Sequence, residues 1–268
     1  MRPSGAPPTF GHVYLLIMEN RGITDILTSS KATYLASLIA RYGLATNYDS
    51  LTRGSQPNYL ALFSGSAQGV ADDLAHDLPA SNLADQLDTA GRTWRVFAEN
   101  VPPDCFTGTL ASGGPDGAGT YARKHEPAIS FTDISTDPSR CSRISDFSHF
   151  DPSAADLELI VPNLCHDMHD CSTADGDAFL ASFVPRIMAS PSWATSVLFI
   201  TFDEGNGVKP HPDRVATIVV APSVRPGLRS DVHHDHYSLL RTIETVLGLP
   251  CLAHSCTAND LSELLAPN

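Results

Sequence analysis

The sequence predicts an α/β fold in which helices cover both faces of a mostly parallel sheet. Apolar runs that fit buried strands alternate along the chain with amphipathic segments that fit helices, the pattern typical of this fold class. The chain has 268 residues, 42% of them hydrophobic, which suits one large domain with a full core. We therefore expect a single domain over residues 1–268, with an extended N-terminal arm over about residues 1–10.

Five apolar runs are expected to form strands of the sheet. They span residues 12–18, 94–98, 157–161, 196–202 and 215–221. Strands covered on both faces are almost continuously apolar, as these runs are. Because parallel strands point in one direction, their carboxyl ends would share one edge of the sheet.

Four segments are expected to be helices. They span residues 32–42, 82–90, 174–189 and 237–247. Gly43, Gly91 and Gly248 follow three of these segments, and glycine is the residue most typical of the position just past a helix. Pro185 lies inside the third segment and should kink it or mark its true start. Residues 102–121, rich in Gly, Pro, Asp and Ser, are expected to form a long surface loop that rims a site.

The charge balance argues against nucleic acid as a partner. Thirty acidic residues against 17 basic ones give a formal net charge of −13, and no run of Lys or Arg stands out. No apolar stretch reaches the roughly 18 residues of a membrane span, and the first residues lack the apolar core of a signal peptide. We expect a soluble domain with no transmembrane segment and no export signal in the given chain; its oligomeric state is not predicted.

The six cysteines fall into local pairs. Local pairing predicts the disulfides Cys105–Cys141, Cys165–Cys171 and Cys251–Cys256. The even count in loops rich in Pro, Asp and Ser favours disulfides over free thiols, and a zinc site is disfavoured because no Cys-x2-Cys pair is present. Disulfides imply an oxidising compartment, so we expect a secreted or periplasmic protein.

Two of the predicted strands end in side chains that carry oxygen atoms. Glu19 and Asn20 follow the run 12–18, and Asp203 and Glu204 follow the run 196–202. At a shared carboxyl edge these four residues would meet. An all-oxygen set suits one divalent cation, with Ca²⁺, Mn²⁺ or Mg²⁺ favoured and Zn²⁺ possible.

Ser55 lies at the expected start of a further helix. Pro57 fits the first helical turn, with Ser55 or Gln56 as the N-cap. A helix N-terminus favours anions, so a phosphoryl group and a developing alkoxide would be stabilised there. Taken alone, the segment favours a capping role for Ser55 over a chemical one.

Histidine and aspartate crowd two predicted loops. One cluster holds His166, Asp167, His169 and Asp170, and the other holds His233, His234, Asp235 and His236. These residues could be zinc ligands, proton donors or phosphate-binding cations. We favour the last two roles, because the strand ends already offer oxygen ligands. Asp72 and Asp73 are expected to be solvated.

Eight segments of the chain carry a family resemblance. They are residues 17–21, 43–48, 55–62, 82–87, 123–125, 162–171, 202–205 and 236–244. Together they resemble the bacterial phosphoesterase family, which holds the acid phosphatases and phospholipases C of the alkaline phosphatase superfamily. The matches fall in order from residue 12 to about residue 250 and so cover nearly the whole chain.

The resemblance implies an alkaline-phosphatase-like α/β/α sandwich of three layers and a hydroxyl that is transiently phosphorylated beside one divalent metal ion. The implied metal ligands are Glu19, Asn20, Ser55, Asp203 and Glu204, with Ser55 also the nucleophile. The resemblance implies that His169 and His236, as catalytic residues, and His76 and His125, as substrate-binding residues, surround the phosphoryl group. Arg53 and Asp167 are further expected substrate-binding residues. If these histidines must be charged, activity should favour acidic pH.

One departure from the family concerns the residues before Ser55. Short members often have His-Pro there, whereas this chain has Arg53 and Gly54. The change bears on rate and substrate more than on reaction type, and Arg53 could hold the phosphate as a bidentate donor.

The expected function is therefore that of a metal-dependent phosphoester hydrolase, with a small phosphomonoester as substrate and an acid phosphatase as the favoured type. A phospholipase C is the alternative, but it needs an apolar rim, and residues 102–121 offer only Phe106, Leu110 and Tyr121 as larger groups. A second alternative is a non-catalytic module that binds a metal or a carbohydrate. Such a module would not need a hydroxyl at a helix N-terminus.

Overall fold

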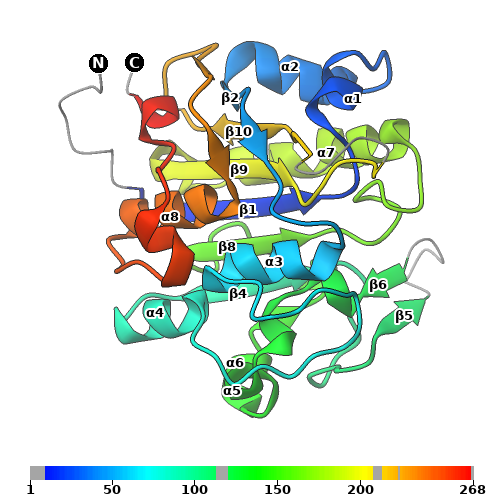
Figure 1. Ribbon diagram of the computed structural model, residues 1–268, viewed down its shortest axis with the longest axis vertical. Coiled ribbons are helices and arrows are strands. Elements are labelled where there is room, and N and C mark those ends of the chain that lie inside the picture. The colour runs from blue at the N-terminus through cyan, green and yellow to red at the C-terminus, as the bar shows by residue number, and fades with distance from the viewer. Residues whose placement is uncertain (1–9, 113–119, 208–212, 223, 267–268) are drawn as a thin grey trace.

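The computed structural model describes residues 10–112, 120–207, 213–222 and 224–266, so residues 1–9 of the expected N-terminal arm lie outside it. An eight-stranded sheet with the order β11-β2-β10-β9-β1-β8-β4-β7 forms the centre of the fold (Figure 1). Two two-stranded sheets, β12-β3 and β5-β6, complete the β structure of these residues. The strands are β1 (His12–Met18), β2 (Gly43–Ala45), β3 (Tyr48–Asp49), β4 (Trp94–Ala98), β5 (Leu110–Ser112), β6 (Thr120–Ala122), β7 (Ile144–Ser145), β8 (Leu157–Val161), β9 (Ser196–Phe202), β10 (Thr217–Val220), β11 (Arg229–Ser230) and β12 (His234–Asp235).

Five neighbouring strands, from β9 to β7, run parallel. β1 pairs with β9 over its whole length, from His12 opposite Ser196 to Met18 opposite Phe202, and with β8 on its other side. β10 is antiparallel to both β9 and β2. The sheet is therefore mixed and mostly parallel, as predicted, and β1 and β9 end at the same level.

Helices cover both faces of the sheet. The α-helices are α1 (Ile23–Leu27), α2 (Thr33–Arg41), α3 (Ser55–Ser64), α4 (Leu83–Thr89), α5 (Thr132–Ser135), α6 (Pro138–Cys141), α7 (Thr173–Met188) and α8 (His236–Leu247). In Figure 1, α3 and α8 pack together in front of the sheet, and α7 lies behind it, in contact with α2. Across the described ranges, none of these helices has the length and apolar character needed to cross a bilayer.

The longest predicted elements match the structure closely. Four predicted strands have the bounds of β1, β4, β8 and β9, and the fifth is shortened to β10. The strands that the sequence did not predict are two or three residues long, too short to show a periodicity. Gly43 does not cap α2 but begins β2, whereas Gly248 caps α8 with a φ of 69°. α7 continues through Pro185, which lies in its last turn and so removes one hydrogen bond without ending the helix early.

Residues 102–121 were predicted as one long loop, and this was partly wrong. β5 and β6 pair antiparallel within and just beyond that stretch, with Leu110 opposite Ala122. Residues 113–119, between the two strands, lie outside the described residues. Arg123, directly after β6, is buried and holds the hairpin through hydrogen bonds to Thr107 and His76.

The three predicted disulfides are all present. They join Cys105 to Cys141, Cys165 to Cys171 and Cys251 to Cys256, with Cα–Cα distances of 5.5, 4.6 and 5.0 Å. The sequence separations are 36, 6 and 5 residues. Chains with such bridges are typical of oxidising compartments.

Removal of the long-range disulfide should destabilise the protein more than removal of a short-range one. The double variant Cys105→Ala/Cys141→Ala frees a long loop in the unfolded chain and is expected to lose about 4 kcal/mol, whereas Cys251→Ala/Cys256→Ala should lose about 2 kcal/mol. Urea unfolding measures both losses. Equal losses would show that loop closure is not what these bridges contribute.

Glu158 on β8 should make stability fall as the pH rises. Its side chain is fully buried, and burial raises its pKa to about 8 although Oε1 accepts hydrogen bonds from the N–H groups of Ala154 and Ala155. Between the unfolded pKa, near 4.3, and the folded one, the folded state holds a proton that the unfolded state releases. Stability is therefore fully present below the unfolded pKa and decreases up to about pH 8.

Glu158→Gln removes this titration while keeping an oxygen acceptor for the two N–H groups. The free energy of unfolding of the variant should fall less between pH 5 and pH 8 than that of the wild type, by a difference on the order of a few kcal/mol. Urea unfolding at both pH values measures this difference. Asp231→Asn, which changes an exposed carboxyl, is the control, and parallel pH profiles of wild type and Glu158→Gln would contradict the prediction.

Candidate active site

The ends of β1 and β9 bring two acidic side chains together. Met18 and Phe202 lie opposite each other, and the residues that follow them, Glu19 and Asp203, are fully buried. The backbone N–H of Asn20 donates to Asp203 Oδ1 at 3.1 Å, and the Asn20 amide donates to Glu19 Oε2 at 3.3 Å. Asn20 adopts a φ of 54°, a left-handed conformation that asparagine tolerates better than most residues. The shared edge therefore joins the two strand ends, as expected.

Ser55 reaches the same point from α3. The helix begins at Ser55, and the N-cap is Gly54, whose φ of 94° favours glycine. The Ser55 hydroxyl is buried and donates to Glu19 Oε2 at 3.0 Å, so it does not cap the helix. The N–H of Gly54 donates to Glu204 Oε1 at 3.1 Å. The Ser55 hydroxyl thus meets Glu19 at the N-terminus of α3, and Glu204 contacts the N-cap residue of the same helix.

Asp73 also contacts the start of α3. Its Oδ1 accepts a hydrogen bond from the N–H of Gln56 at 3.0 Å, and its Oδ2 lies 3.1 Å from the Lys124 ammonium. Asp73 is exposed, as predicted, but it also has these two specific partners. A carboxylate at this N–H is what the positive end of a helix dipole favours.

His125 lies between two carboxylates. Its Nδ1 is 3.1 Å from Asp167 Oδ2, and its Nε2 is 3.3 Å from Glu19 Oε1. The ring is buried and stacks on Tyr59 with a centroid distance of 5.2 Å. A carboxylate on Nδ1 fixes the orientation of the ring and leaves Nε2 directed at Glu19.

His169 is held in a similar way. Its backbone N–H donates to Asp167 Oδ1 at 2.6 Å, and its ring Nδ1 is 2.7 Å from Asp170 Oδ1. Its Nε2 lies 3.2 Å from the Lys124 ammonium. Asp167 thus holds both histidines. Its Oδ2 contacts the ring of His125, and its Oδ1 accepts from the backbone N–H of His169.

Glu19, His125 and His169 form a group that could hold a metal ion. One donor atom from each lies within 4.8 Å of the others, and within the described part of the chain no further set of His, Cys, Asp and Glu meets this criterion. Glu19 Oε1, His125 Nε2 and Asp203 Oδ2 are buried and have no hydrogen-bond partner. These residues fit a cation.

Burial shifts the pKa of each acidic group in this cluster. Desolvation, followed by repulsion from Asp203 and Asp167, raises the pKa of Glu19 well above its ordinary value. Desolvation likewise raises the pKa of Asp203 and of Asp167, and it lowers the pKa of His125 well below its ordinary value. Buried carboxylates this close together resist ionisation unless a cation neutralises them. Neutral imidazole and ionised carboxylate are the forms that bind metals.

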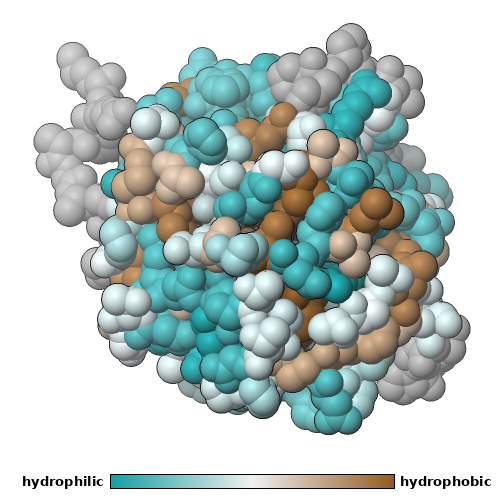
Figure 2. Space-filling view, turned by 60° about the horizontal axis from the view of Figure 1, so that its bottom comes forward, coloured by the Kyte–Doolittle hydropathy of each residue, from teal (hydrophilic) through white to brown (hydrophobic). Residues whose placement is uncertain are grey.

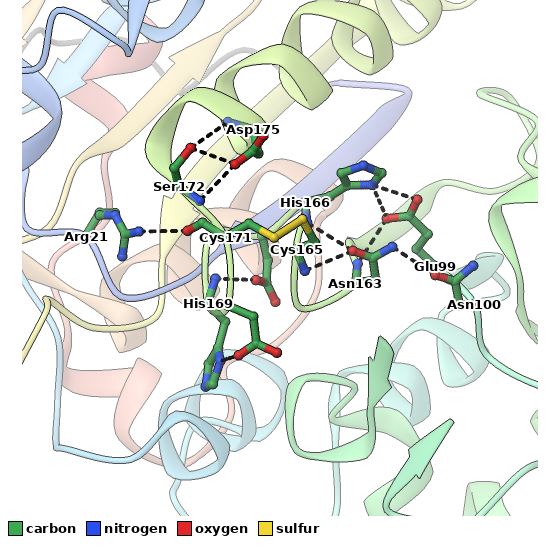
Figure 3. The surroundings of a disulfide bond; sticks show 12 residues. Arg21, Glu99, Asn100, Asn163, Cys165, His166, His169, Cys171, Ser172 and Asp175 are labelled. Atoms are coloured by element: carbon green, nitrogen blue, oxygen red, sulfur yellow. Dashed lines mark hydrogen bonds and ion pairs between the residues drawn. A yellow bond between two sulfur atoms is a disulfide. The ribbon is translucent and has the colours of Figure 1, made fainter. Parts of the chain in front are cut away.

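A disulfide closes the loop that carries Asp167 and His169. The loop connects β8 to α7, and Figure 3 shows the Cys165–Cys171 bridge that joins its two ends. Arg21 donates to the carbonyl oxygen of Cys171 at 3.1 Å and to that of Asn20 at 2.9 Å. The loop is therefore tied to the end of β1, where the metal-binding group lies.

Polar contacts anchor the other side of this loop to the end of β4 (Figure 3). The ring Nδ1 of His166 lies 2.8 Å from Glu99 Oε1, and the Asn163 amide donates to Asn100 Oδ1 at 2.8 Å. Asn163 Oδ1 in turn accepts from the N–H groups of residues 165 and 166, both at 3.0 Å. His166 thus supports the loop, while His169 faces the site.

His236 lies behind Asp203. Its Nε2 is 2.6 Å from the carbonyl oxygen of Asp203, and its Nδ1 is 2.9 Å from the Tyr48 hydroxyl. Burial lowers the pKa of His236 to about 4, so the ring is neutral at higher pH. The structure therefore brings His236 to the backbone of a site residue and not to the open side of the cluster.

Two further predicted residues lie at the periphery. His76 contacts Asp72 with 2.7 Å between Nε2 and Oδ1, and its ring is partly exposed. Arg53 is exposed. The φ of 94° at Gly54 is one that proline cannot adopt, so the backbone before Ser55 differs from that of a His-Pro segment.

Sequence reasoning overlooked Lys124 and Tyr59. Lys124 contacts both Asp73 and His169, and Tyr59 forms the stacking wall for His125. Both residues lie in segments that carry the family resemblance. Three consecutive basic residues at 123–125 in a chain of net charge −13 were a signal that could have indicated Lys124.

Comparisons with known proteins agree with this geometry. The sequence pattern of the Phosphoesterase family matches residues 23–250. A phosphatidylinositol-3-phosphatase of Mycobacterium tuberculosis is 32% identical over 97% of this chain and 85% of its own length. A probable acid phosphatase of Kluyveromyces lactis is 30% identical over 94% of this chain, and a non-specific phospholipase C1 of Arabidopsis thaliana is 24% identical over 61% of it. The chain spans only 62% and 30% of the length of these two relatives.

Solved structures show the same fold. A protein of the alkaline phosphatase superfamily from Vibrio parahaemolyticus aligns with a TM-score of 0.60 at 10% identity, over 92% of this chain and 71% of its own. A sulfatase from Pseudoalteromonas aligns with a TM-score of 0.62 at 13% identity, over 97% of this chain and 72% of its own. With the family match and the relatives above, this shows that the chain belongs to the Phosphoesterase family and is a phosphoric ester hydrolase with the fold of the alkaline phosphatase superfamily.

Proposed function

We propose that the protein is a metal-dependent phosphomonoesterase that acts through a phosphorylated Ser55. The single observation that carries this proposal is the buried Ser55 hydroxyl, which donates to Glu19 at the N-terminus of α3. Ser55 Oγ forms a bond to phosphorus while the bond between phosphorus and the alcohol oxygen breaks, and the proton of the Ser55 hydroxyl leaves with the alcohol. Water then cleaves the phosphoserine, which releases phosphate and restores the hydroxyl.

The surrounding residues orient these groups. Glu19 Oε2 directs the Ser55 hydroxyl, and the Asn20 amide holds that carboxylate from the other side. The Lys124 ammonium lies at the open edge, where it can neutralise phosphoryl oxygens. His236 positions the backbone that carries Asp203 and is a positioning residue.

Glu19, His125 and His169 would hold the divalent metal ion, with Asn20, Asp203 and Glu204 as nearby oxygen donors. When bound, the ion would lower the pKa of the Ser55 hydroxyl and neutralise a phosphate oxygen. Two imidazoles and a carboxylate favour Mn²⁺ or Zn²⁺ over Ca²⁺, because Ca²⁺ prefers ligands that are all oxygen atoms.

The substrate is proposed to be a small phosphomonoester, which makes the protein an acid phosphatase. The relatives named acid phosphatase support this, and the phospholipase C relatives leave a diester as the alternative. Tyr121, one of three larger groups expected at the rim, is buried, which leaves Phe106 and Leu110 as the larger rim groups that a substrate can reach. Assays with an aryl phosphomonoester and a choline phosphodiester separate the two, and turnover of neither with any divalent metal would favour a non-catalytic binding module.

The three disulfides support a location outside the cytoplasm, and we propose that the protein is secreted or periplasmic.

Ser55→Ala is expected to lower kcat on an aryl phosphate by about 10³-fold or more, because alanine has no hydroxyl to act as the nucleophile. After an acid quench, mass spectrometry should find phosphate on the wild-type peptide that contains Ser55 and none on the variant. Ser64→Ala removes a buried hydroxyl at the other end of the same helix and should retain turnover. Wild-type turnover by Ser55→Ala would refute the phosphoserine route.

Metal removal should abolish turnover and destabilise the fold. A chelator is expected to remove one equivalent of metal, and readdition at 100 times the dissociation constant should restore about 2.7 kcal/mol of stability. Elemental analysis and thermal unfolding measure both effects for Mn²⁺, Zn²⁺ and Ca²⁺ in turn.

Glu19→Gln should lose the bound metal while keeping the acceptor for Ser55. Glu244→Gln changes an equally buried glutamate, held by Ser255 and the N–H of Leu252, and should keep its metal. Equal metal content in the two variants would remove Glu19 from the proposed ligands.

A further inference from the structure

A small pocket lies directly against the candidate active site. Its volume is about 340 Å³, at the lower end of the range of ligand pockets. Asp73 and Lys124 line one side of it, and the other lining residues include Leu74, Ala75 and Leu110. The pocket thus lies between the loop before residue 76 and the hairpin of β5 and β6.

The pocket shares one wall with the site. Asp73 accepts a hydrogen bond from the N–H of Gln56, the residue next to Ser55. Lys124 bridges Asp73, at 3.1 Å, and His169, at 3.2 Å. A group attached to a phosphoryl group at Ser55 therefore has this pocket as its neighbour.

Two exposed leucines give the pocket an apolar character. Leu74 is 67% exposed and Leu110 is 60% exposed, and the described residues include just two other exposed large hydrophobic side chains, Leu27 at 53% and Val232 at 43%. A single exposed apolar side chain needs no explanation, but two of four around one pocket beside a reaction centre do. Figure 2 shows hydrophobic residues among hydrophilic ones on its right side. This is the side on which the parallel strands end in Figure 1.

The charged residues of the pocket are already paired. The Arg123 guanidinium is buried and donates to the carbonyl oxygens of Thr107 and His76 and to Asp77. The Lys124 ammonium is paired with Asp73. The described lining residues therefore provide apolar surface. Both of their positively charged groups already have partners, so the pocket does not favour an anionic group on the substrate in addition to the phosphoryl group.

We propose that this pocket binds the hydrocarbon part of the alcohol that leaves from the phosphoester. The proposal rests on the proposed phosphomonoesterase function and adds a substrate class to it: alkyl or aryl phosphates rather than phosphates of sugars or other polyols. Leu74 and Leu110 are then specificity-determining residues, because binding removes their exposed surface from water.

The test compares kcat/KM for hexyl phosphate and methyl phosphate. The wild type should prefer hexyl phosphate, and Leu74→Ser and Leu110→Ser should each reduce the ratio of the two values by roughly tenfold. Leu110→Met should keep the ratio, because it preserves apolar surface. Leu27→Ser is the matched control: Leu27 is 53% exposed at the end of α1 and does not line the pocket. A wild-type ratio near one, or equal ratios in all variants, would overturn the proposal.

A binding measurement separates this proposal from the proposed function. Calorimetry with hexylphosphonate and methylphosphonate, which are not esters, requires no turnover by the metal-loaded protein. The wild type should bind hexylphosphonate about tenfold more tightly, and Leu74→Ser and Leu110→Ser should lose that difference. If neither alkyl phosphate is hydrolysed, the phosphomonoesterase function fails, and the pocket proposal still stands or falls on these affinities.

Discussion

Two buried carboxylates at adjacent strand ends are the constraint on which the rest of the site depends. The register between β1 and β9 places Glu19 and Asp203 side by side in the protein interior. Desolvation raises the pKa of both groups, and repulsion from Asp203 adds to the shift of Glu19, so a cation beside them favours their ionised forms. The ammonium of Lys124, the imidazoles of two histidines and the N-terminus of α3 all surround this point. An arrangement of this kind is costly for stability alone and is typical of a site that binds metal and phosphate.

The loop after β8 holds Asp167 and His169 in place and is itself fixed by several contacts. The Cys165–Cys171 bridge, the Arg21 contacts and the Asn163 network hold it at both ends. Asp167 contacts both His125 and His169, so one buried carboxylate sets the position of two candidate ligands. The Cys165–Cys171 disulfide therefore matters to the chemistry, because it reduces the freedom of the residues that hold the ligands.

The hairpin of β5 and β6 leads into the segment that presents Lys124 and His125 to the site. Arg123 anchors this segment with its buried guanidinium, and the next two residues point to the candidate metal site. Leu110 of the hairpin lines the apolar pocket, and Lys124 and His125, which follow the hairpin, contact the candidate site. In the proposed mechanism, this segment would link the site that binds the phosphoryl group to the surface that contacts the leaving alcohol.

The apolar runs and the cysteine positions predicted the fold class, the main strands, the disulfide pairs and the meeting of Glu19 with Asp203, and the family resemblance added Ser55 to them. Long apolar runs and parallel strands are local and repetitive features, and a shared edge follows from them. Contacts made on folding, which the sequence did not reveal, place His125 against Glu19 and His236 behind Asp203. The direction of a side chain depends on contacts between residues far apart in the chain, such as His125 with Asp167, and no sequence spacing encodes them. For the same reason the sequence could not assign roles to Lys124 and Asp73, whose importance comes from the neighbours that folding gives them.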